Sequence, residues 1–199
     1  MLRRTLLILI LGLISLFIAG IFWNQEIKYQ LPTPQPANYR PVTLGEKVYL
    51  NNQFKLSENK PILIHFFNPG CPCSKFNIEH FNEIVKKYKS IVDIYVVVKT
   101  DDDIDTEDIK KKFSEDVKVL LDADDQIANN CGVYATPQGV LIDKDRDLYY
   151  RGNYNKSRYC TSKESNYVDM AIDSLLAGKK YPVFESAALI PYGCEIPKK

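Results

Sequence analysis

Residues 61–74 read Pro-Ile-Leu-Ile-His-Phe-Phe-Asn-Pro-Gly-Cys-Pro-Cys-Ser, an apolar run followed by two closely spaced cysteines. The length and continuous apolar character of the run predict a buried strand over residues 61–68. Residues 71–88 then place their apolar side chains largely on one face of a helix. A cysteine at the start of a helix meets unpaired backbone N–H groups and the positive end of the helix dipole, which favour the thiolate. The stretch therefore predicts a reactive thiol, Cys71, at a strand-to-helix junction.

The first 23 residues predict one transmembrane helix. Arg3 and Arg4 precede nineteen uncharged, mostly apolar residues that end at Trp23. At about 1.5 Å per residue, such a helix just spans the hydrocarbon core of a bilayer. The arginines predict a cytoplasmic N-terminus, and Trp23 suits the far interface. A cleaved signal peptide, with Ile18-Ala19-Gly20 as a weak cleavage site, is the alternative. In either case we expect the remaining chain in the periplasm or outside the cell, where cysteines meet oxidising conditions.

The rest of the chain predicts a linker, one domain and a tail. Residues 24–41 are polar, contain four prolines and predict an extended spacer. Residues 42–180 are enough to bury a core without disulfide staples, and residues 181–199 are predicted as a C-terminal tail. The net charge of +1 gives no reason to expect a nucleic-acid partner. Because the number of cysteines is odd, at least one of the five is expected to lack an intramolecular partner.

Within residues 42–180, strand patterns alternate with helix patterns and end in a hairpin and a last helix. This order predicts a three-layer α/β domain around a central mixed sheet. Besides the strand and helix at residues 61–88, the expected elements are a hairpin of residues 48–50 and 54–56, strands at 91–98 and 117–121, helices at 105–114 and 125–130, a hairpin of 137–143 and 147–151, and a helix at 164–176.

The chain from about Pro41 to Lys180 resembles the thioredoxin fold, specifically its extracytoplasmic redoxin branch. Three features carry the resemblance, which covers about 140 residues. They are Phe66-Phe-Asn-Pro-Gly-Cys71-Pro-Cys73 at the first helix, Tyr134-Ala-Thr136-Pro137 before the second hairpin, and Val140-Leu-Ile-Asp143 with Tyr150-Arg151-Gly152 within it.

The resemblance implies a thiol–disulfide oxidoreductase in which Cys71 is the nucleophile and attacks a disulfide sulfur through a mixed disulfide. In this family the proline that matches Pro137 is cis and faces the active cysteine. The backbone of the residue before it can pair with an extended substrate segment. The implied partners are extracytoplasmic protein thiols or disulfides, and no organic cofactor is implied because electrons arrive and leave as thiols. The residues expected to line the groove are Pro72, Ser74, Thr136 and Pro137.

The motif departs from the family at its second cysteine. The family has C-x-x-C, whereas here Ser74 occupies the second position and Cys73 lies one residue early. Two candidates for the resolving thiol are open. One is Cys73, whose bridge to Cys71 would close a very small, strained ring. The other is Cys160, in a loop that the fold is expected to place over the same groove.

The other cysteines and the two histidines have weaker signals. Cys131 is predicted as a small packing residue at the end of a short helix. Cys194 lies in the tail, where no role follows from the sequence, and a Cys160–Cys194 bridge is an alternative. His65 is predicted as an interior residue of the first core strand and His80 as a surface residue of the first helix.

Three other functions compete with the oxidoreductase. A peroxiredoxin is disfavoured because that family places threonine three residues before its reactive cysteine, where this chain has Asn68. A copper chaperone would use Cys71 and Cys73 as two soft thiolates for Cu(I). Its relatives use C-x-x-x-C and a distal histidine, however, and no histidine follows His80. A non-catalytic binding module is the third alternative, because Ser74 replaces the usual second cysteine. The sequence favours a membrane-anchored extracytoplasmic oxidoreductase.

Overall fold

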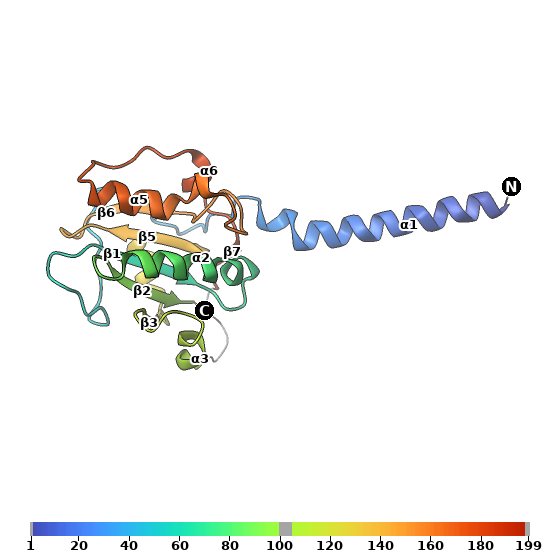
Figure 1. The fold of residues 1–199 in the computed structure, drawn as a ribbon. Coiled ribbons are helices and arrows are strands. Elements are labelled where there is room, and N and C mark those ends of the chain that lie inside the picture. Colours follow the sequence, from blue (N-terminus) through green and yellow to red (C-terminus); the bar gives the residue numbers. More distant parts are fainter. Residues whose placement is uncertain (1, 100–104, 198–199) are drawn as a thin grey trace.

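A five-stranded mixed sheet is the centre of the domain (Figure 1). The structure, a computed structural model, describes residues 2–99 and 105–197, so that Met1 of the predicted anchor and residues 198–199 of the predicted tail lie outside it. The strand order is β3-β2-β1-β5-β6, in which β1, β2 and β3 are parallel and β5 and β6 are each antiparallel to the preceding neighbour. The strands are β1 (Ile62–Phe67), β2 (Asp93–Val98), β3 (Lys118–Leu121), β5 (Gln138–Ile142) and β6 (Leu148–Gly152).

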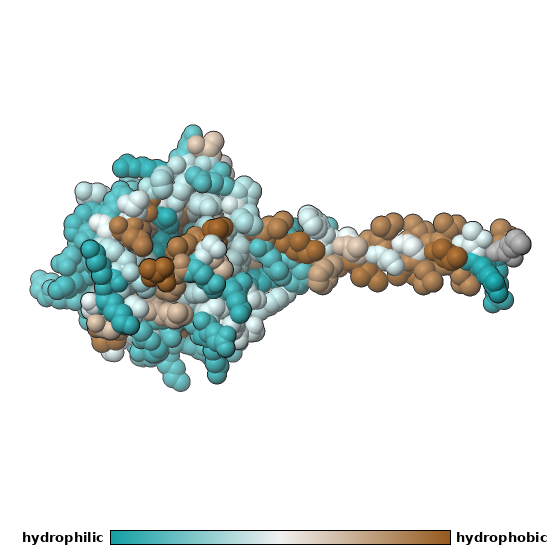
Figure 2. Space-filling view, turned by 90° about the horizontal axis from the view of Figure 1, so that it is seen from above, coloured by the Kyte–Doolittle hydropathy of each residue, from teal (hydrophilic) through white to brown (hydrophobic). Residues whose placement is uncertain are grey.

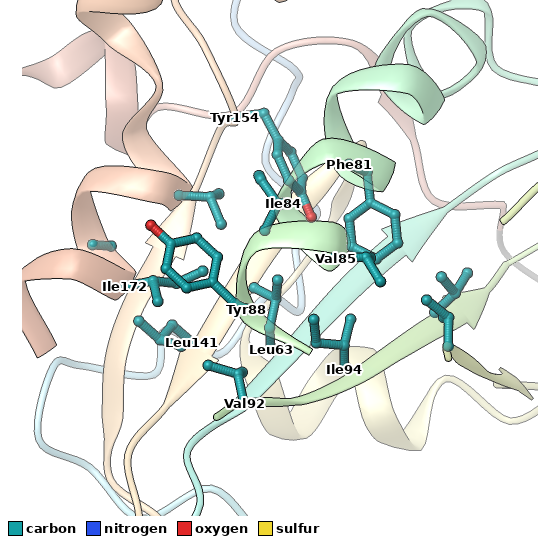
Figure 3. Packing of buried hydrophobic residues seen from close by; sticks show 14 of the residues in the cluster. Leu63, Phe81, Ile84, Val85, Tyr88, Val92, Ile94, Leu141, Tyr154 and Ile172 are labelled. Carbon is teal, nitrogen blue, oxygen red and sulfur yellow. The ribbon is translucent and has the colours of Figure 1, made fainter. Parts of the chain in front are cut away.

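Alternate residues of β1 enter two separate hydrophobic cores, one on each face of the sheet. Leu63 and Phe67 join the first core, whereas Ile64 and Phe66 join the second, as the two-residue period of a strand requires. Helices α2 (Pro72–Tyr88) and α5 (Tyr167–Leu176) cover the first core, which Figure 3 shows. Helix α4 (Gln126–Cys131) covers the second. The predicted three-layer α/β architecture is therefore confirmed.

The helix starts follow from local residues. Cys71 is the N-cap of α2 and Pro72 occupies its first turn, where the missing N–H of proline costs no hydrogen bond. The Asp105 side chain accepts a hydrogen bond of 2.9 Å from the Glu107 N–H and caps α3 (Thr106–Lys110). The predicted cap is confirmed, but α3 ends at Lys110 and is shorter than the expected 105–114.

Two further expected elements differ from the structure. No strand forms at residues 48–50 or 54–56, so the predicted first hairpin is wrong. The Val48 N–H instead donates to the Arg146 carbonyl oxygen at 2.9 Å, so this backbone pairs with the β5–β6 turn. Val48 and Phe54 bury their side chains in the second core, which explains the apolar pattern without a hairpin. The helix predicted at residues 164–176, α5, begins at Tyr167 after a short 3-10 turn, η2 (Lys163–Ser165), and not at residue 164.

A long apolar helix, α1 (Leu2–Gln25), extends away from the domain (Figure 1). None of its side chains is buried against the rest of the chain, and its surface is hydrophobic along most of its length (Figure 2). Its length and composition suffice to cross a membrane, a test that a signal sequence also passes. A 3-10 turn, η1 (Ile27–Tyr29), follows it and leads into the domain.

The C-terminal residues return to the domain and are folded. Helix α6 (Ser186–Leu189) lies against β6, and Asn153 donates to the carbonyl oxygens of Ala187 and Ile190 at 2.8 Å and 2.7 Å. A two-residue strand, β7 (Cys194–Glu195), then pairs with β4 (Ala135–Thr136) in a second, small sheet. Residues 186–195 of the segment predicted as a tail are thus folded against the domain.

Both histidines are buried on the face of the sheet that carries the first core. His65 is an interior residue as predicted, and its Nδ1 lies 2.8 Å from the Tyr154 hydroxyl. His80 is only 8 % exposed, so its prediction as a surface residue is wrong. Its ring faces Tyr154, which packs against α2 from the loop after β6. Burial lowers the pKa of both rings, and that of His65 falls to about 3.

We expect the free energy of unfolding to fall as the pH is lowered from about 6.5 toward 3. Unfolded His65 binds a proton in this window, whereas folded His65, with a pKa of about 3, does not. One such histidine contributes at most about 1.4 kcal/mol per pH unit. His65→Gln does not titrate and should give a shallower pH slope, to which His80 still contributes, although its stability at pH 7 is lower. Denaturant unfolding of the full-length protein in detergent measures both slopes, and identical slopes would contradict the prediction.

Candidate active site

The turn between β1 and α2 holds Cys71 at the carboxyl end of β1, the central strand of the sheet. The Cys71 N–H donates to the Asn68 carbonyl oxygen at 3.0 Å, and the Gly70 N–H donates to the Asn68 side chain at 2.8 Å. The Ser74 hydroxyl accepts a hydrogen bond of 3.3 Å from the Asn68 N–H and is fully buried. Ser74, expected as a groove residue, therefore lies inside the turn and stabilises it.

Cys71 forms a disulfide with Cys194, 123 residues later in the chain. Their Cα atoms are 5.9 Å apart, within the usual range for a disulfide. Cys73, Cys131 and Cys160 are free thiols. None of the bridges considered from the sequence is present: neither Cys71–Cys73, nor Cys71–Cys160, nor Cys160–Cys194. The correction has a topological cause, because the returning C-terminal segment brings Cys194 to the start of α2.

The returning segment occupies the groove that the sequence predicted for a substrate. β7 pairs antiparallel with β4, placing Cys194 opposite Thr136 and Glu195 opposite Ala135. The Thr136–Pro137 peptide bond is cis, as expected, and the Cys71 Sγ lies 3.5 Å from the Thr136 carbonyl oxygen. Both Thr136 and Pro137 are buried. We call residues 193–195, which lie beside β4, the tail strand.

Gly193 lets the tail strand approach β4 closely. Its φ is +114°, a backbone conformation that residues with a side chain rarely adopt. A Cβ atom added to Gly193 would overlap the carbonyl oxygen of Thr136, and it would lie 3.6 Å from the Cβ of Cys73. Glycine is therefore required directly before Cys194 for both the backbone conformation and the available space.

Of the two candidate resolving thiols, Cys73 is buried and Cys160 is partly buried. Cys73 has no exposed surface, and burial raises the pKa of its thiol, an effect that the nearby Arg158 guanidinium opposes. Burial also raises the pKa of Cys160 to about 11, although an Asn77 side-chain N–H donates to its sulfur at 3.0 Å. Both thiols are therefore predominantly protonated at neutral pH. Cys131 is fully buried in the second core with a raised pKa, which confirms its prediction as a packing residue.

The segment after α1 contacts the same corner of the domain. Arg158 forms an ion pair of 2.9 Å with Glu26, and its guanidinium lies over the Tyr29 ring at 5.3 Å. The Thr33 N–H donates to the Pro191 carbonyl oxygen at 2.8 Å, three residues before Cys194. In Figure 1, α1 accordingly leaves the domain on the side where β7 lies. The disulfide thus lies at the end of the domain nearest the apolar helix.

Sequence reasoning missed Cys194 and Arg158 as residues of this site. The Tyr-Gly-Cys sequence at residues 192–194 was a signal for Cys194, since glycine before a cysteine suits a close strand contact. No comparable signal exists for Arg158, whose contacts depend on Glu26 and Tyr29, more than a hundred residues away in the chain.

The positions of Cys71 and Cys73 argue against the copper-chaperone alternative. That function requires the sulfurs of Cys71 and Cys73 as two thiolate ligands. In the structure the Cys71 sulfur is bonded to Cys194, and Cys73 is buried with a raised pKa. Among residues 2–99 and 105–197, no group of three or more histidine, cysteine or acidic side chains is arranged to hold a metal ion. The arrangement instead suits thiol–disulfide exchange, which needs only a disulfide and access to one of its sulfurs.

Comparison with known proteins relates this chain to one family model and to thiol-disulfide oxidoreductases. A family model described as "Domain of unknown function (DUF6436)" matches residues 43–195, and so includes both Cys71 and Cys194. The chain is similar to the thiol-disulfide oxidoreductase ResA of Bacillus thuringiensis, with 29% identity over 146 residues, which are 72% of this chain and 81% of that protein.

Solved structures show the same fold. A hypothetical protein from Sinorhizobium meliloti 1021 superposes with a TM-score of 0.64 at 21% identity, covering 79% of this chain and 96% of that one. A thioredoxin-like protein solved in its oxidised form superposes with a TM-score of 0.50 at 19% identity, covering 78% of this chain and all of that one. The domain therefore has the thioredoxin-like fold.

Proposed function

The chain belongs to the DUF6436 family, and we propose that it is a membrane-anchored thiol–disulfide oxidoreductase whose redox pair is Cys71 and Cys194. One observation carries the proposal: a disulfide joins the N-cap of α2 to a strand paired beside the cis proline. The start of a 17-residue helix stabilises negative charge on the Cys71 sulfur after reduction. The ResA relative, named a thiol-disulfide oxidoreductase, supports the same reaction.

In this proposal each cycle transfers two electrons. Two external thiols reduce the Cys71–Cys194 disulfide and become a disulfide themselves. The reduced pair then returns the electrons to an acceptor disulfide, with Cys71 as the attacking thiolate and Cys194 as the resolving thiol. The groove residues are Pro72, Thr136 and Pro137. Cys73 and Cys160 lie outside the pair, since both are free and buried or partly buried with raised pKa values.

We also propose that the segment of residues 1–23 is retained as a membrane anchor, with the N-terminus of the chain in the cytoplasm. Arg3 and Arg4 at the first end of the helix support this orientation. The domain would then lie outside the cytoplasm, joined through a linker at residues 24–41. Its partners would be extracytoplasmic protein thiols or disulfides. A persistent disulfide is compatible with that compartment.

The proposal is tested by titrating full-length protein in detergent with mixtures of reduced and oxidised glutathione. After alkylation, peptide mass mapping counts the free and bridged cysteines at each ratio. We expect one reversible two-electron step in which Cys71 and Cys194 become alkylated together. Cys194→Ala should abolish this step.

The outcome opposing the proposal is a disulfide that no glutathione ratio reduces while the protein remains folded. A second opposing outcome is a reversible bridge between Cys71 and Cys73 in the wild-type protein. Cys131→Ala is a matched control, because Cys131 is a buried free thiol that packs in the second core and forms no disulfide.

A further inference from the structure

The two residues of the redox pair differ in exposure. Cys71 is only 1 % exposed, whereas Cys194 is partly exposed in the tail strand. Cys71 is enclosed by the start of α2, by the Thr136 carbonyl oxygen at 3.5 Å and by the tail strand itself. Since exchange requires direct contact of a thiolate with the sulfur that it attacks, these surroundings protect Cys71 while the disulfide is intact.

The two sulfurs also differ as leaving groups. Attack on one sulfur of a disulfide expels the other as a thiolate, and a better stabilised thiolate leaves faster. The Cys71 sulfur is at the N-cap of α2, where backbone N–H groups stabilise negative charge. Cys194 is in a two-residue strand, with the carboxylate of Glu195 next to it in the sequence. Leaving-group stability therefore favours expulsion of Cys71 and attack at Cys194.

We propose that Cys194 is the sulfur that external thiols attack in the oxidised protein, and that Cys71 is the leaving group. This inference rests on the proposed function and assigns the order of its first steps. An external thiolate bonds to the Cys194 sulfur, and the bond between Cys194 and Cys71 breaks to give a Cys71 thiolate. A second external thiolate then attacks the sulfur of the first one. That step releases Cys194 as a thiol, after proton uptake, and the external pair leaves as a disulfide.

The first step also opens the groove. Once the bond to Cys71 is broken, the tail strand pairs with β4 through a two-residue backbone ladder and through the Ile196 N–H, which donates to the Tyr134 carbonyl oxygen at 3.1 Å. At its ends, the Tyr192 hydroxyl donates to the Asn155 carbonyl oxygen at 2.7 Å and Ile196 packs against the second core. A two-residue pairing is weak without a covalent link. Release of the tail strand exposes the Thr136 backbone and Cys71 together. The oxidised protein is thus closed to a second partner, and the reduced protein is open to it.

The site of attack is measured by exposing oxidised wild-type protein, full length in detergent, to glutathione for short times. Acid stops the exchange, and N-ethylmaleimide then blocks the thiols that have been freed. Peptide mass mapping reads which cysteine carries glutathione and which carries the maleimide. We expect glutathione on Cys194 with maleimide on Cys71, in at least about tenfold excess over the reverse pattern. The same reaction in concentrated urea is the matched control, in which both sulfurs are accessible and the preference should disappear.

Each outcome decides a separate point. Glutathione mainly on Cys71, or equally on both cysteines of the folded protein, would overturn the inference and leave the proposed function standing. No glutathione adduct on either cysteine, with the disulfide intact at all times, would count against the proposed function itself. A preference for Cys194 that persists in urea would also contradict the inference, because the fold would then not be its cause.

Discussion

Replacing Cys71 by serine is expected to lower the rate of dithiol–disulfide turnover by at least about a thousandfold, as removal of a nucleophile that acts with a partner usually does. The remaining Cys194 can still form a mixed disulfide in this variant, but no thiolate at the start of α2 is left to complete the exchange. Turnover is measured as the rate at which full-length protein in detergent equilibrates reduced glutathione with a disulfide-bonded model protein.

The matched controls for Cys71→Ser are Cys73→Ala and Cys160→Ala. Both thiols lie near the disulfide but outside the redox pair, so each variant should keep its turnover within about threefold of the wild-type rate, provided that it folds. Circular dichroism and the presence of the Cys71–Cys194 bridge check the folding. A large loss of turnover in a folded Cys73→Ala protein would show that the short Cys71-Pro72-Cys73 motif carries the exchange after all.

Gly193→Ala is expected to shift the Cys71–Cys194 equilibrium toward the dithiol by about 10- to 100-fold at a given glutathione ratio. The alanine has to adopt a φ near +114°, which costs about 1–3 kcal/mol for a residue with a side chain, and its Cβ would overlap the Thr136 carbonyl oxygen. Both costs fall on the closed form alone, because the tail strand leaves β4 in the open form. A free-energy difference of about 1.4 kcal/mol corresponds to a tenfold shift.

Gly178→Ala is the matched control for this substitution. Gly178 also has a positive φ, of +68°, but a Cβ atom added there has no neighbour within 4 Å, and it follows α5, outside the tail strand. This variant should lose some stability while leaving the glutathione ratio at half-reduction unchanged. Equal midpoints for Gly193→Ala and the wild type would mean that the pairing of β7 with β4 does not stabilise the disulfide.

Much of the site was predictable because its parts are local in sequence. The apolar run of β1, the proline after the N-cap of α2 and the Thr136–Pro137 pair each lie within a few residues. The Asn68–Cys71 turn also explains the departure at Ser74, whose hydroxyl holds this turn in place. The hairpin predicted at residues 48–56 was wrong because a local apolar pattern shows that residues are buried but not what they pack against. Val48 and Phe54 are buried, but their burial comes from packing on the sheet and not from pairing with each other.

The amino-acid sequence by itself determined the order of the core strands and helices from β1 to α5, the position of Cys71 at the start of a helix and the apolar N-terminal helix, because periodicity and helix-capping act over short distances. Only the tertiary structure decided which cysteine is the disulfide partner of Cys71. Cys71 and Cys194 are 123 residues apart, and the contact between them depends on backbone hydrogen bonds between β4 and β7, which almost any side chains permit. A two-residue ladder has no hydrophobic pattern to reveal it. The Cys71–Cys194 pair could therefore be identified only from the folded structure.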